Sequence, residues 1–247
     1  MPEALVIGGG RGIGAAIADA LAQAGHNVTF TTRTADPAPR LAELQARHPT
    51  QSFAARALDL ADRAAVDALA SEIEDATYAI LVHVAGTTYD RLAAMMEQDP
   101  AEALMQVNFW SFTRLARAAI RPMTRAKTGR VIAIGSVVGH QASQGNAAYG
   151  ASKAALAAYV KTLALESARR NVTVNCIAPG FVDTDMIAAF ADYRKATETR
   201  IPAGRYATAQ EIAAVASFLA SPAASYVTGA VIPVDGGLTA SLGIPRS

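Results

Sequence analysis

The sequence is nearly free of cysteine, because Cys176 is the single one among 247 residues. An intramolecular disulfide is therefore excluded, and this composition is typical of proteins from reducing compartments. Because Cys176 lies within the apolar run 172–178, we expect a small buried side chain there and no reactive thiol.

An excess of charge of either sign is also missing. The chain carries 22 Lys and Arg against 21 Asp and Glu, a formal net charge of +1, with no block of like charge. This distribution predicts no nucleic-acid partner and no binding to an acidic membrane surface. Long hydrophobic runs are lacking too, and residues 1–7 lack the regions of a signal peptide. We therefore expect a soluble, cytoplasmic protein, and no motif indicates a metal site.

Short apolar segments alternate with longer, alanine-rich amphipathic segments along the chain, which is 51% hydrophobic. Such alternation is typical of βαβ units and of a parallel sheet buried on both faces. The sequence therefore predicts an α/β fold: a single-domain, Rossmann-like, doubly wound parallel sheet of about seven strands, with helices on both faces, spanning residues 1–247. The expected strands are 4–7, 27–32, 52–57, 78–84, 130–135, 172–178 and 230–234, and the expected helices are 12–24, 38–48, 62–76, 99–127, 148–170 and 208–220.

Residues 183–207 do not follow this alternation. They mix charged residues with Pro202 and Gly204, which predicts an irregular segment. A stretch of this length late in the chain is expected to form a mobile lid over the active site.

Glycines cluster directly after the first expected strand, in the segment Ile7-Gly-Gly-Gly-Arg-Gly-Ile-Gly14. Glycine lets the backbone turn tightly and approach a pyrophosphate, whose charge then faces the start of the following helix. Two registers fit: Gly10-x-Gly12-x-x-Ala15, whose first glycine comes late, and Gly8-x-x-x-Gly12-x-Gly14, whose first glycine ends the strand. Either one predicts a dinucleotide site that includes Arg11 and Ile13.

The end of the second expected strand indicates which dinucleotide is bound. Enzymes that use NAD place an acidic side chain there to bind the ribose 2′-hydroxyl group. Here Thr32 occupies that position, Arg33 follows it, and Arg11 lies in the glycine turn, whereas Asp36 lies beyond the strand. Two guanidinium groups and a hydroxyl group suit a 2′-phosphate, which predicts NADP(H). The alternative is that both arginines are solvated surface residues.

Three polar residues form the candidate catalytic group. Ser136 ends the fifth expected strand, and Tyr149 and Lys153 are four residues apart on the helix that follows. Side chains at this spacing share one helix face, and an ammonium group one turn from a phenol favours the phenolate. The carboxyl edge of an open α/β sheet is where ligands bind, so Ser136 can hold a substrate oxygen beside Tyr149.

The glycine turn, Asn108, Ser136, Tyr149 and Lys153 together resemble the motifs of the short-chain dehydrogenase/reductase family, and the similarity extends over essentially the whole chain. The resemblance implies hydride transfer between NADP(H) and a carbonyl/alcohol pair, with Tyr149 as the acid. It also implies that Asn108 supports a proton relay from Lys153 and that Lys153 binds the nicotinamide ribose. The remaining cofactor contacts that it implies are Asp59 and Leu60 at the adenine, Ala85 and Gly86 after the fourth strand, and Pro179, Gly180, Val182 and Thr184 at the nicotinamide.

The sequence departs from the family pattern in two places. Ile7 stands where a threonine usually opens the glycine turn, and His83-Val84 replaces the usual Asn-Asn. Because these segments lie side by side in the family, we expect Ile7 and Val84 to be a coupled exchange of polar for apolar packing that leaves no buried group unpaired. We expect His83 to be a structural residue.

Within the family, several stretches look most like bacterial 3-oxoacyl-[acyl-carrier-protein] reductases, above all Ile134-Gly-Ser-Val-Val-Gly139 and Ala178-Pro-Gly-Phe-Val-Asp-Thr-Asp-Met186. The leading interpretation is therefore reduction of a carrier-bound 3-oxoacyl group. Two alternatives stay open: a reductase of free ketones, sugars or alicyclic alcohols, and a non-catalytic regulator that senses NADP(H).

The resemblance also implies two kinds of protein partner. Arg130 and Arg170 match basic positions through which such reductases are thought to dock an acidic carrier protein, and we expect them near the site entrance. The alternative is that both are solvated, since arginine is common at a helix C-terminus. The helices at 99–127 and 148–170 carry many small residues, which let another helix approach closely. Because family members pair these helices between subunits and are often tetramers, the resemblance implies a homotetramer, the alternative being that the small residues face only the sheet.

Overall fold

The computed structural model describes residues 1–33, 36–184 and 191–240, and the side chains of all of these except residues 191–193. Its centre is one seven-stranded sheet in the order β3-β2-β1-β4-β5-β6-β7, in which every neighbouring pair is parallel. The strands are β1 Glu3–Ile7, β2 Asn27–Thr32, β3 Phe53–Ala57, β4 Tyr78–His83, β5 Gly129–Ile134, β6 Val172–Pro179 and β7 Val231–Val234. The predicted fold class, a doubly wound α/β domain, is confirmed.

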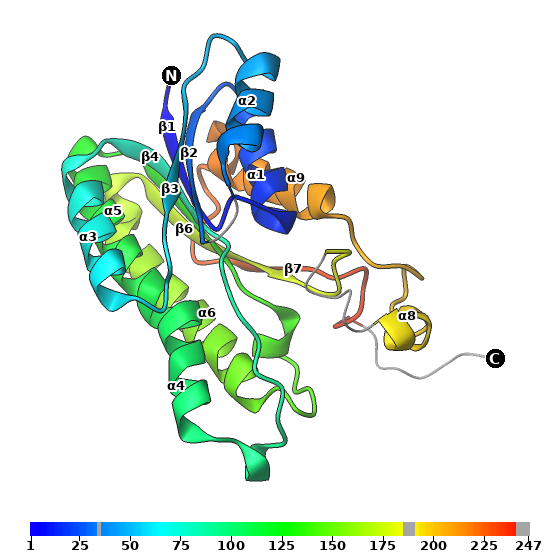
Figure 1. Ribbon diagram of the computed structural model, residues 1–247. Coiled ribbons are helices and arrows are strands. Elements are labelled where there is room, and N and C mark those ends of the chain that lie inside the picture. Colours follow the sequence, from blue (N-terminus) through cyan, green and yellow to red (C-terminus); the bar gives the residue numbers. More distant parts are fainter. Residues whose placement is uncertain (34–35, 185–190, 241–247) are drawn as a thin grey trace.

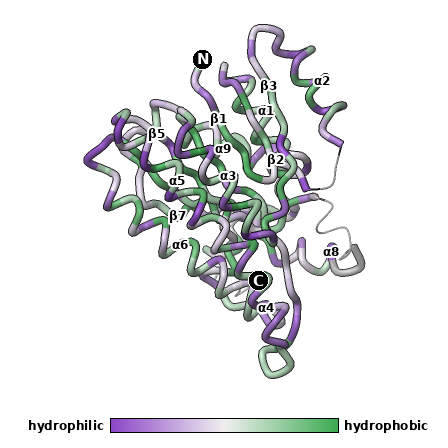
Figure 2. Tube along the Cα trace, turned by 60° about the vertical axis from the view of Figure 1, so that its left-hand side comes forward, coloured by the Kyte–Doolittle hydropathy of each residue, from purple (hydrophilic) through white to green (hydrophobic). Residues whose placement is uncertain are grey.

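Helices cover both faces of the sheet (Figure 1). The α-helices are α1 Gly12–Gln23, α2 Ala38–Arg47, α3 Arg63–Asp75, α4 Gln98–Met105, α5 Ser111–Ala126, α6 Ala147–Ser167, α8 Ala191–Glu198 and α9 Ala209–Ala220. One core packs α1 and α9 against the sheet, and the other packs α3, α5 and α6 against its opposite face. The hydrophobic residues lie in the sheet and in the helix faces toward it, and the hydrophilic ones lie on the outer turns (Figure 2). None of the helices in the described ranges is long and apolar enough to cross a membrane.

Each end of each predicted strand lies within one residue of the observed end. The predicted helix 99–127 is wrong in one respect, because the π-helical turn η2, Gln106–Trp110, separates α4 from α5. The predicted irregular stretch 183–207 is also wrong in part, since it contains α8. Residues 185–190 of the expected lid, with Met186 of the quoted motif, lie outside the described residues.

The strand order places the candidate site. The chain winds outward in both directions from β1 and β4, so the order reverses between these two strands. Open α/β sheets bind ligands at such a reversal, in the crevice outside the carboxyl ends of the strands. β1 ends at Ile7 and β4 at His83, so the glycine turn and the segment after β4 both open onto this crevice.

Candidate functional site

The glycine turn connects β1 to α1 in a conformation that demands glycine. Gly8 has φ +84°, and a Cβ there would lie 2.8 Å from that of Ala85. A Cβ on Gly14 would collide with the carbonyl oxygen of Gly8. These requirements favour the register Gly8-x-x-x-Gly12-x-Gly14 over the one that starts at Gly10.

The start of α1 is suited to an anion. Its N-cap residue, Arg11, provides no side-chain cap, and the first turn holds no acidic residue. The first amide groups of a helix have no partner within the helix and carry the positive end of its dipole. The backbone at 12–14 can therefore donate hydrogen bonds to a phosphate.

The departure at Ile7 and Val84 has a compensation that sequence reasoning missed. The amide groups of Val84 and Ala85 both donate to the carbonyl oxygen of Ile7, at 2.9 and 3.1 Å. The Gly8 amide donates to the hydroxyl group of Thr31 at 2.9 Å, and Thr31 is buried. The turn is thus held from β2 and from the segment after β4 by hydrogen bonds that need no polar side chain at position 7.

The predicted 2′-phosphate residues lie together at the end of β2. Arg33 and Arg11 are exposed, and neither forms an ion pair with a described residue. A Cβ on Gly10 would lie 2.9 Å from the Thr32 hydroxyl oxygen, so the glycine turn and Thr32 are in contact. Asp36 instead accepts a hydrogen bond from the Ala38 amide at 3.0 Å, beside the start of α2.

The adenine end of the candidate site follows β3. The Leu58 amide donates to the Thr32 carbonyl oxygen at 2.9 Å, which carries the chain past the end of β2. The next residue, Asp59, is exposed and Leu60 is buried. These residues therefore continue the same edge of the sheet as Thr32.

Tyr149 and Lys153 project from the first turns of α6 toward the ends of β4 and β5. The Lys153 ammonium group lies 5.7 Å from the centre of the Tyr149 ring and donates to the Ile134 carbonyl oxygen at 3.0 Å. Only 4% of Lys153 is exposed. A cation buried this deeply with one backbone partner is held in a fixed place beside the tyrosine.

Two glycines let α6 pack closely against the segment that carries Ser136. A Cβ on Gly139 would lie 2.9 Å from the Lys153 carbonyl carbon, and one on Gly150 would lie 3.1 Å from the Val138 carbonyl oxygen. Ser136 follows β5 by one residue, and its hydroxyl oxygen accepts a hydrogen bond from the Val138 amide at 3.3 Å. The remaining lone pair and the hydroxyl proton are available to a ligand.

Asn108 lies in the π-helical turn between α4 and α5, a type of turn that often marks functional sites. Its side chain is buried and pairs with both backbone groups of Thr87: Oδ1 accepts at 2.8 Å and Nδ2 donates at 2.9 Å. Nδ2 also donates to the Ser152 hydroxyl oxygen at 3.1 Å, and Ser152 donates to the Tyr149 carbonyl oxygen at 2.7 Å. Asn108 is therefore tied to the helix that carries Tyr149.

Gly86 completes this group. A Cβ on Gly86 would lie 3.3 Å from both the Asn108 Oδ1 atom and the Lys153 ammonium nitrogen. The segment after β4 therefore passes directly over the two polar side chains, and Ala85 and Gly86 connect them to the glycine turn.

His83 lies behind the site and is fully buried. Its Nε2 atom is 3.2 Å from the Ser111 hydroxyl oxygen, and Ser111 donates to the Val107 carbonyl oxygen at 2.6 Å. Burial, with a smaller effect of the Lys153 charge, lowers the pKa of His83 to about 3. The neutral imidazole steadies the π-helical turn. Burial likewise raises the pKa of the Cys176 thiol to about 11, which agrees with the small buried side chain that we expected there.

The segment after β6 crosses the glycine turn. The Gly180 amide donates to the Val234 carbonyl oxygen at 3.1 Å, and a Cβ there would lie 2.9 Å from that of Asp235. Val182 is buried and pairs with Ala207. Thr184 lies 3.6 Å from where a Cβ on Gly12 would be. Pro179 to Thr184 thus reach from the sheet to the start of α1.

Arg130 and Arg170 are not brought to this edge. Arg130 is the second residue of β5 and Arg170 ends the 3₁₀ turn just before β6, so both lie at the amino edge of the sheet. Ser136 is six residues further along than Arg130, which at ~3.3 Å per residue is about 20 Å away. Within one chain the two arginines therefore lie at the edge of the sheet opposite the site entrance. Our expectation that they lie near this entrance is wrong for a single chain.

Comparison with known proteins agrees with this geometry. A family model described as enoyl-(acyl carrier protein) reductase matches residues 8–239. A 3-oxoacyl-[acyl-carrier-protein] reductase of Pseudomonas aeruginosa is 41% identical over 238 residues, which are 95% of this chain and 96% of the relative.

Two solved structures share the fold. One is a protein proposed to be an NAD(P)-dependent gluconate 5-dehydrogenase from Beutenbergia cavernae, with NADP bound at low occupancy; it is 37% identical, has a TM-score of 0.92 and covers 97% of each chain. The other is proposed to be a 2-deoxy-D-gluconate 3-dehydrogenase of Agrobacterium tumefaciens with bound NADP, 34% identical with a TM-score of 0.90, again over 97% of each chain. The cofactor is NADP(H), and the unpaired arginines and the uncapped start of α1 fit its phosphates.

Proposed function

The chain belongs to the short-chain dehydrogenase/reductase family, and on this premise we propose that it reduces a 3-oxoacyl thioester, bound to an acyl carrier protein, to the 3-hydroxyacyl thioester. Its general reaction class is that of an NADP-dependent oxidoreductase. The observation that carries the proposal is the group of Asn108, Ser136, Tyr149 and Lys153 at one edge of the sheet, next to a turn suited to a dinucleotide.

Each side chain of this group has a role that its position supports. When bound, NADPH supplies the hydride that reduces the carbonyl carbon. The Tyr149 hydroxyl group donates the proton to the substrate oxygen, and Ser136 orients that oxygen by hydrogen bonding. Lys153, held 5.7 Å from the tyrosine ring, stabilises the phenolate that forms. Asn108 holds the segment at Thr87 and supports proton return to Lys153.

The carrier-bound substrate is favoured by the identity to 3-oxoacyl-[acyl-carrier-protein] reductases over almost the whole chain. The second candidate, reduction of a free sugar-like ketone, is favoured by the two solved structures proposed to be sugar-acid dehydrogenases. A panel of substrates with NADPH tests the proposal. We expect 3-oxoacyl thioesters to be reduced with a far higher kcat/KM than free keto-acids, and the reverse order would favour the second candidate.

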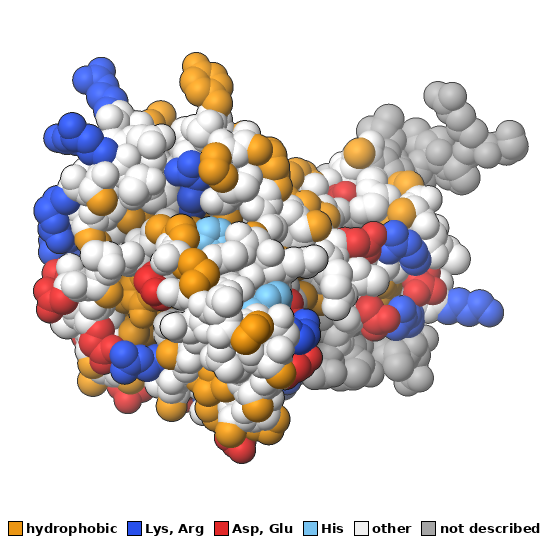
Figure 3. All heavy atoms as spheres, turned by 90° about the horizontal axis from the view of Figure 1, so that it is seen from above, with side chains coloured by type: hydrophobic (Ala, Val, Ile, Leu, Met, Phe, Trp, Pro, Cys, Tyr) orange, Lys and Arg blue, Asp and Glu red, His pale blue; other side chains and the backbone are white. Residues whose placement is uncertain are grey.

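A surface at the amino edge of the sheet supports docking of an acidic carrier protein. Figure 3 views the molecule from above this edge and shows Lys and Arg side chains gathered along one side of it. We call this surface the basic edge, and its residues are Arg125, Lys127, Arg130, Arg169 and Arg170. None of the five forms an ion pair with a described residue. Because the basic edge lies opposite Tyr149, docking there requires that it serve the site of a neighbouring subunit.

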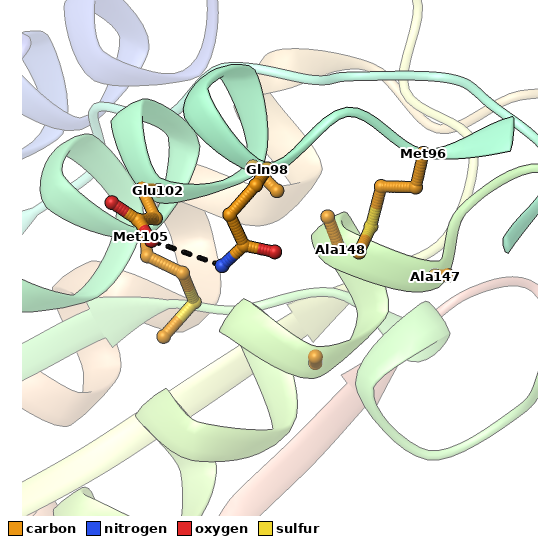
Figure 4. A pocket seen from close by; sticks show the side chains of 8 residues that line it. Met96, Gln98, Glu102, Met105, Ala147 and Ala148 are labelled. Atoms are coloured by element: carbon orange, nitrogen blue, oxygen red, sulfur yellow. Dashed lines mark hydrogen bonds between the residues drawn. The ribbon is translucent and has the colours of Figure 1, made fainter.

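The proposed homotetramer would supply such a neighbour. The outer face of α6 exposes a row of small residues and, beyond Lys161, Leu165, of which 81% is exposed. Beside this face, between α4 and the start of α6, is a hollow of about 240 Å³ lined largely by apolar side chains, with the Gln98–Glu102 hydrogen bond on one wall (Figure 4). An exposed apolar helix face next to an apolar hollow suits helix packing between subunits. Light scattering should give four times the mass of one chain. That the protein is cytoplasmic, and that residues 183–207 form a mobile lid over the active site, stay predictions.

A further inference from the structure

Arg194, on α8, contacts three segments at once. Its Nη1 and Nη2 atoms donate to the two carboxylate oxygens of Asp183, at 2.9 and 3.0 Å. Its Nε atom donates to Glu198 at 2.9 Å. The face of the guanidinium group lies 4.8 Å from the centre of the Tyr206 ring. Every nitrogen of the side chain, and its flat face, is thus in use.

Asp183 is part of the segment that crosses the glycine turn. It lies between Val182, which is buried, and Thr184, which is in contact with the start of α1 at Gly12. The Asp183 amide donates to the Ala207 carbonyl oxygen at 2.8 Å. The backbone that carries the Asp183 carboxylate is therefore part of the cofactor-binding edge. The hydrogen bonds from Arg194 hold the pKa of this carboxyl group below its usual range.

Tyr206 extends the same arrangement inward. It is 4% exposed, and its ring stacks on that of Phe181 with centroids 5.3 Å apart and an angle of 19° between the planes. The Ala207 amide donates to the Phe181 carbonyl oxygen at 2.9 Å. Arg194 therefore covers a stacked aromatic pair whose backbone also pairs with the segment 181–183.

From this geometry we infer that Arg194 is a positioning residue for the nicotinamide half of NADP(H). Through Asp183 and Tyr206 it joins α8 to the segment 181–184 and keeps Thr184 against the glycine turn. The inference rests on the proposed function in one respect, the nicotinamide role of Pro179 to Thr184. Arg194 acts through these residues and needs no contact with the cofactor of its own.

The test compares two ligands that differ in the nicotinamide half. NADPH spans the whole site, whereas adenosine 2′,5′-bisphosphate carries only the adenine, its ribose and the 2′- and 5′-phosphates. In Arg194→Met we expect the Kd for NADPH, measured by fluorescence titration without substrate, to rise about three- to tenfold, the scale of an exposed ion pair plus a cation–π contact. The Kd for the bisphosphate should be unchanged.

Arg205 provides a matched control. It forms an exposed bidentate pair with Glu211, at 2.8 and 2.7 Å, that lies within one loop and the start of α9. Arg205→Met removes this pair and a hydrogen bond to the Tyr206 carbonyl oxygen at 3.0 Å, but it keeps every contact between Arg194, Asp183 and the Tyr206 ring. It should therefore leave both Kd values unchanged. Asp183→Asn should reproduce the ion-pair part of the effect of Arg194→Met, and the double variant should be no worse than Arg194→Met alone. The effect should shrink in high salt, because the pair is exposed.

The outcomes separate the inference from the proposed function. If wild-type protein binds neither ligand, the assignment of the cofactor site itself is wrong. If wild type binds both, and Arg194→Met weakens both equally or neither, the positioning role is wrong while the proposed function stands. Midpoints of thermal unfolding without ligand should agree between the Arg194→Met and Arg205→Met variants. A selective loss for NADPH can then not be assigned to a general loss of stability.

Discussion

The Gly8 amide donates a 2.9 Å hydrogen bond to the hydroxyl group of Thr31. This contact joins the turn after β1 to the end of β2. Thr31→Val keeps the shape but leaves the amide unpaired, which costs about 1–3 kcal/mol for a buried group. We expect the free energy of unfolding in urea to fall by about this much, and the affinity for NADPH to fall with it.

Two neighbouring changes control for the substitution. Thr31→Ser retains the hydroxyl acceptor and should recover most of the loss. Thr29 points from the same face of β2 and is also buried, but its hydroxyl group has no such partner among the described residues. If Thr29→Val destabilises the protein as much as Thr31→Val, the Gly8 contact is not what stabilises the turn.

Tyr149→Phe removes the proposed acid and keeps the ring that packs against Ala148 and its neighbours. General acid catalysis typically contributes ~10²–10⁴-fold, so kcat should fall by at least ~10²-fold. NADPH binding, followed by fluorescence titration, should persist. Near-normal turnover of a 3-oxoacyl thioester would remove Tyr149 from the mechanism.

How well the sequence anticipated this site depends on the range of each interaction. The glycine turn, Ser136 and the Tyr149–Lys153 pair are local patterns on elements whose apolar period is clear, and each lies within one residue of its expected place. The Thr31 contact spans 23 residues and joins a hydroxyl group to a backbone amide. The spacing of apolar residues along the sequence does not indicate such a pair, and nothing in the sequence distinguishes Thr31 from any other threonine in a strand.

The π-helical turn at Asn108 shows a second limit. One extra residue in a turn hardly disturbs the pattern of apolar residues over 99–127, so the sequence predicts one continuous helix. Arg194 shows a third. Its partners Asp183 and Tyr206 lie on both sides of it in the chain, in a stretch whose charges suggested only an irregular lid. Tertiary packing decides these features, and the local pattern does not record them.

Arg33 tests the preference for NADPH. It is exposed, unpaired among the described residues and next to Thr32, so a 2′-phosphate would gain a charge-assisted hydrogen bond from it. Arg33→Ala should weaken NADPH binding by ~1.5–3 kcal/mol and leave NADH binding nearly unchanged. Isothermal titration with each cofactor measures both. Equal losses for the two would show that Arg33 does not contact the 2′-phosphate.

His83 makes stability depend on pH. Burial lowers its pKa in the folded chain to about 3 from a usual 6.5, so between these values the unfolded chain binds a proton that the folded chain does not. The contribution of this group to stability is therefore present above pH 6.5 and is lost as pH falls, by up to ~1.4 kcal/mol per pH unit. Urea unfolding of wild type and His83→Asn between pH 7 and pH 4.5 measures it.

Other groups titrate in both proteins, so the difference between the two curves is the informative quantity. The free energy of unfolding of wild type should fall more steeply with acid than that of His83→Asn, and the two values should approach each other. Parallel curves would mean that His83 carries a charge in the folded protein, which its burial against Ser111 and Phe112 opposes.

The basic edge provides the last prediction, which concerns the carrier protein. Charge pairs between proteins act mainly on the rate of encounter, and salt screens them over about 10 Å at ~0.1 M. Arg130→Glu/Arg170→Glu should therefore lower kcat/KM for a carrier-bound 3-oxoacyl substrate, most at low salt, and leave that for a small 3-oxoacyl thioester unchanged. Arg47→Glu/Arg56→Glu alters net charge equally on α2 and β3 and should affect neither substrate.

Mixed oligomers decide which subunit the basic edge serves. In its own chain, Arg130 of the basic edge lies about 20 Å from Ser136, because six residues separate them at a rise of ~3.3 Å per residue. A Tyr149→Phe subunit keeps a basic edge but no acid, and the charge-reversed subunit keeps the acid but no basic edge. If one subunit docks the carrier protein for the site of its neighbour, mixing the two should restore part of the activity on the carrier-bound substrate. No recovery in verified mixed oligomers would refute docking at the basic edge, because this edge cannot serve the site of its own chain. Equal loss of both substrates in the double variant would likewise refute docking by Arg130 and Arg170.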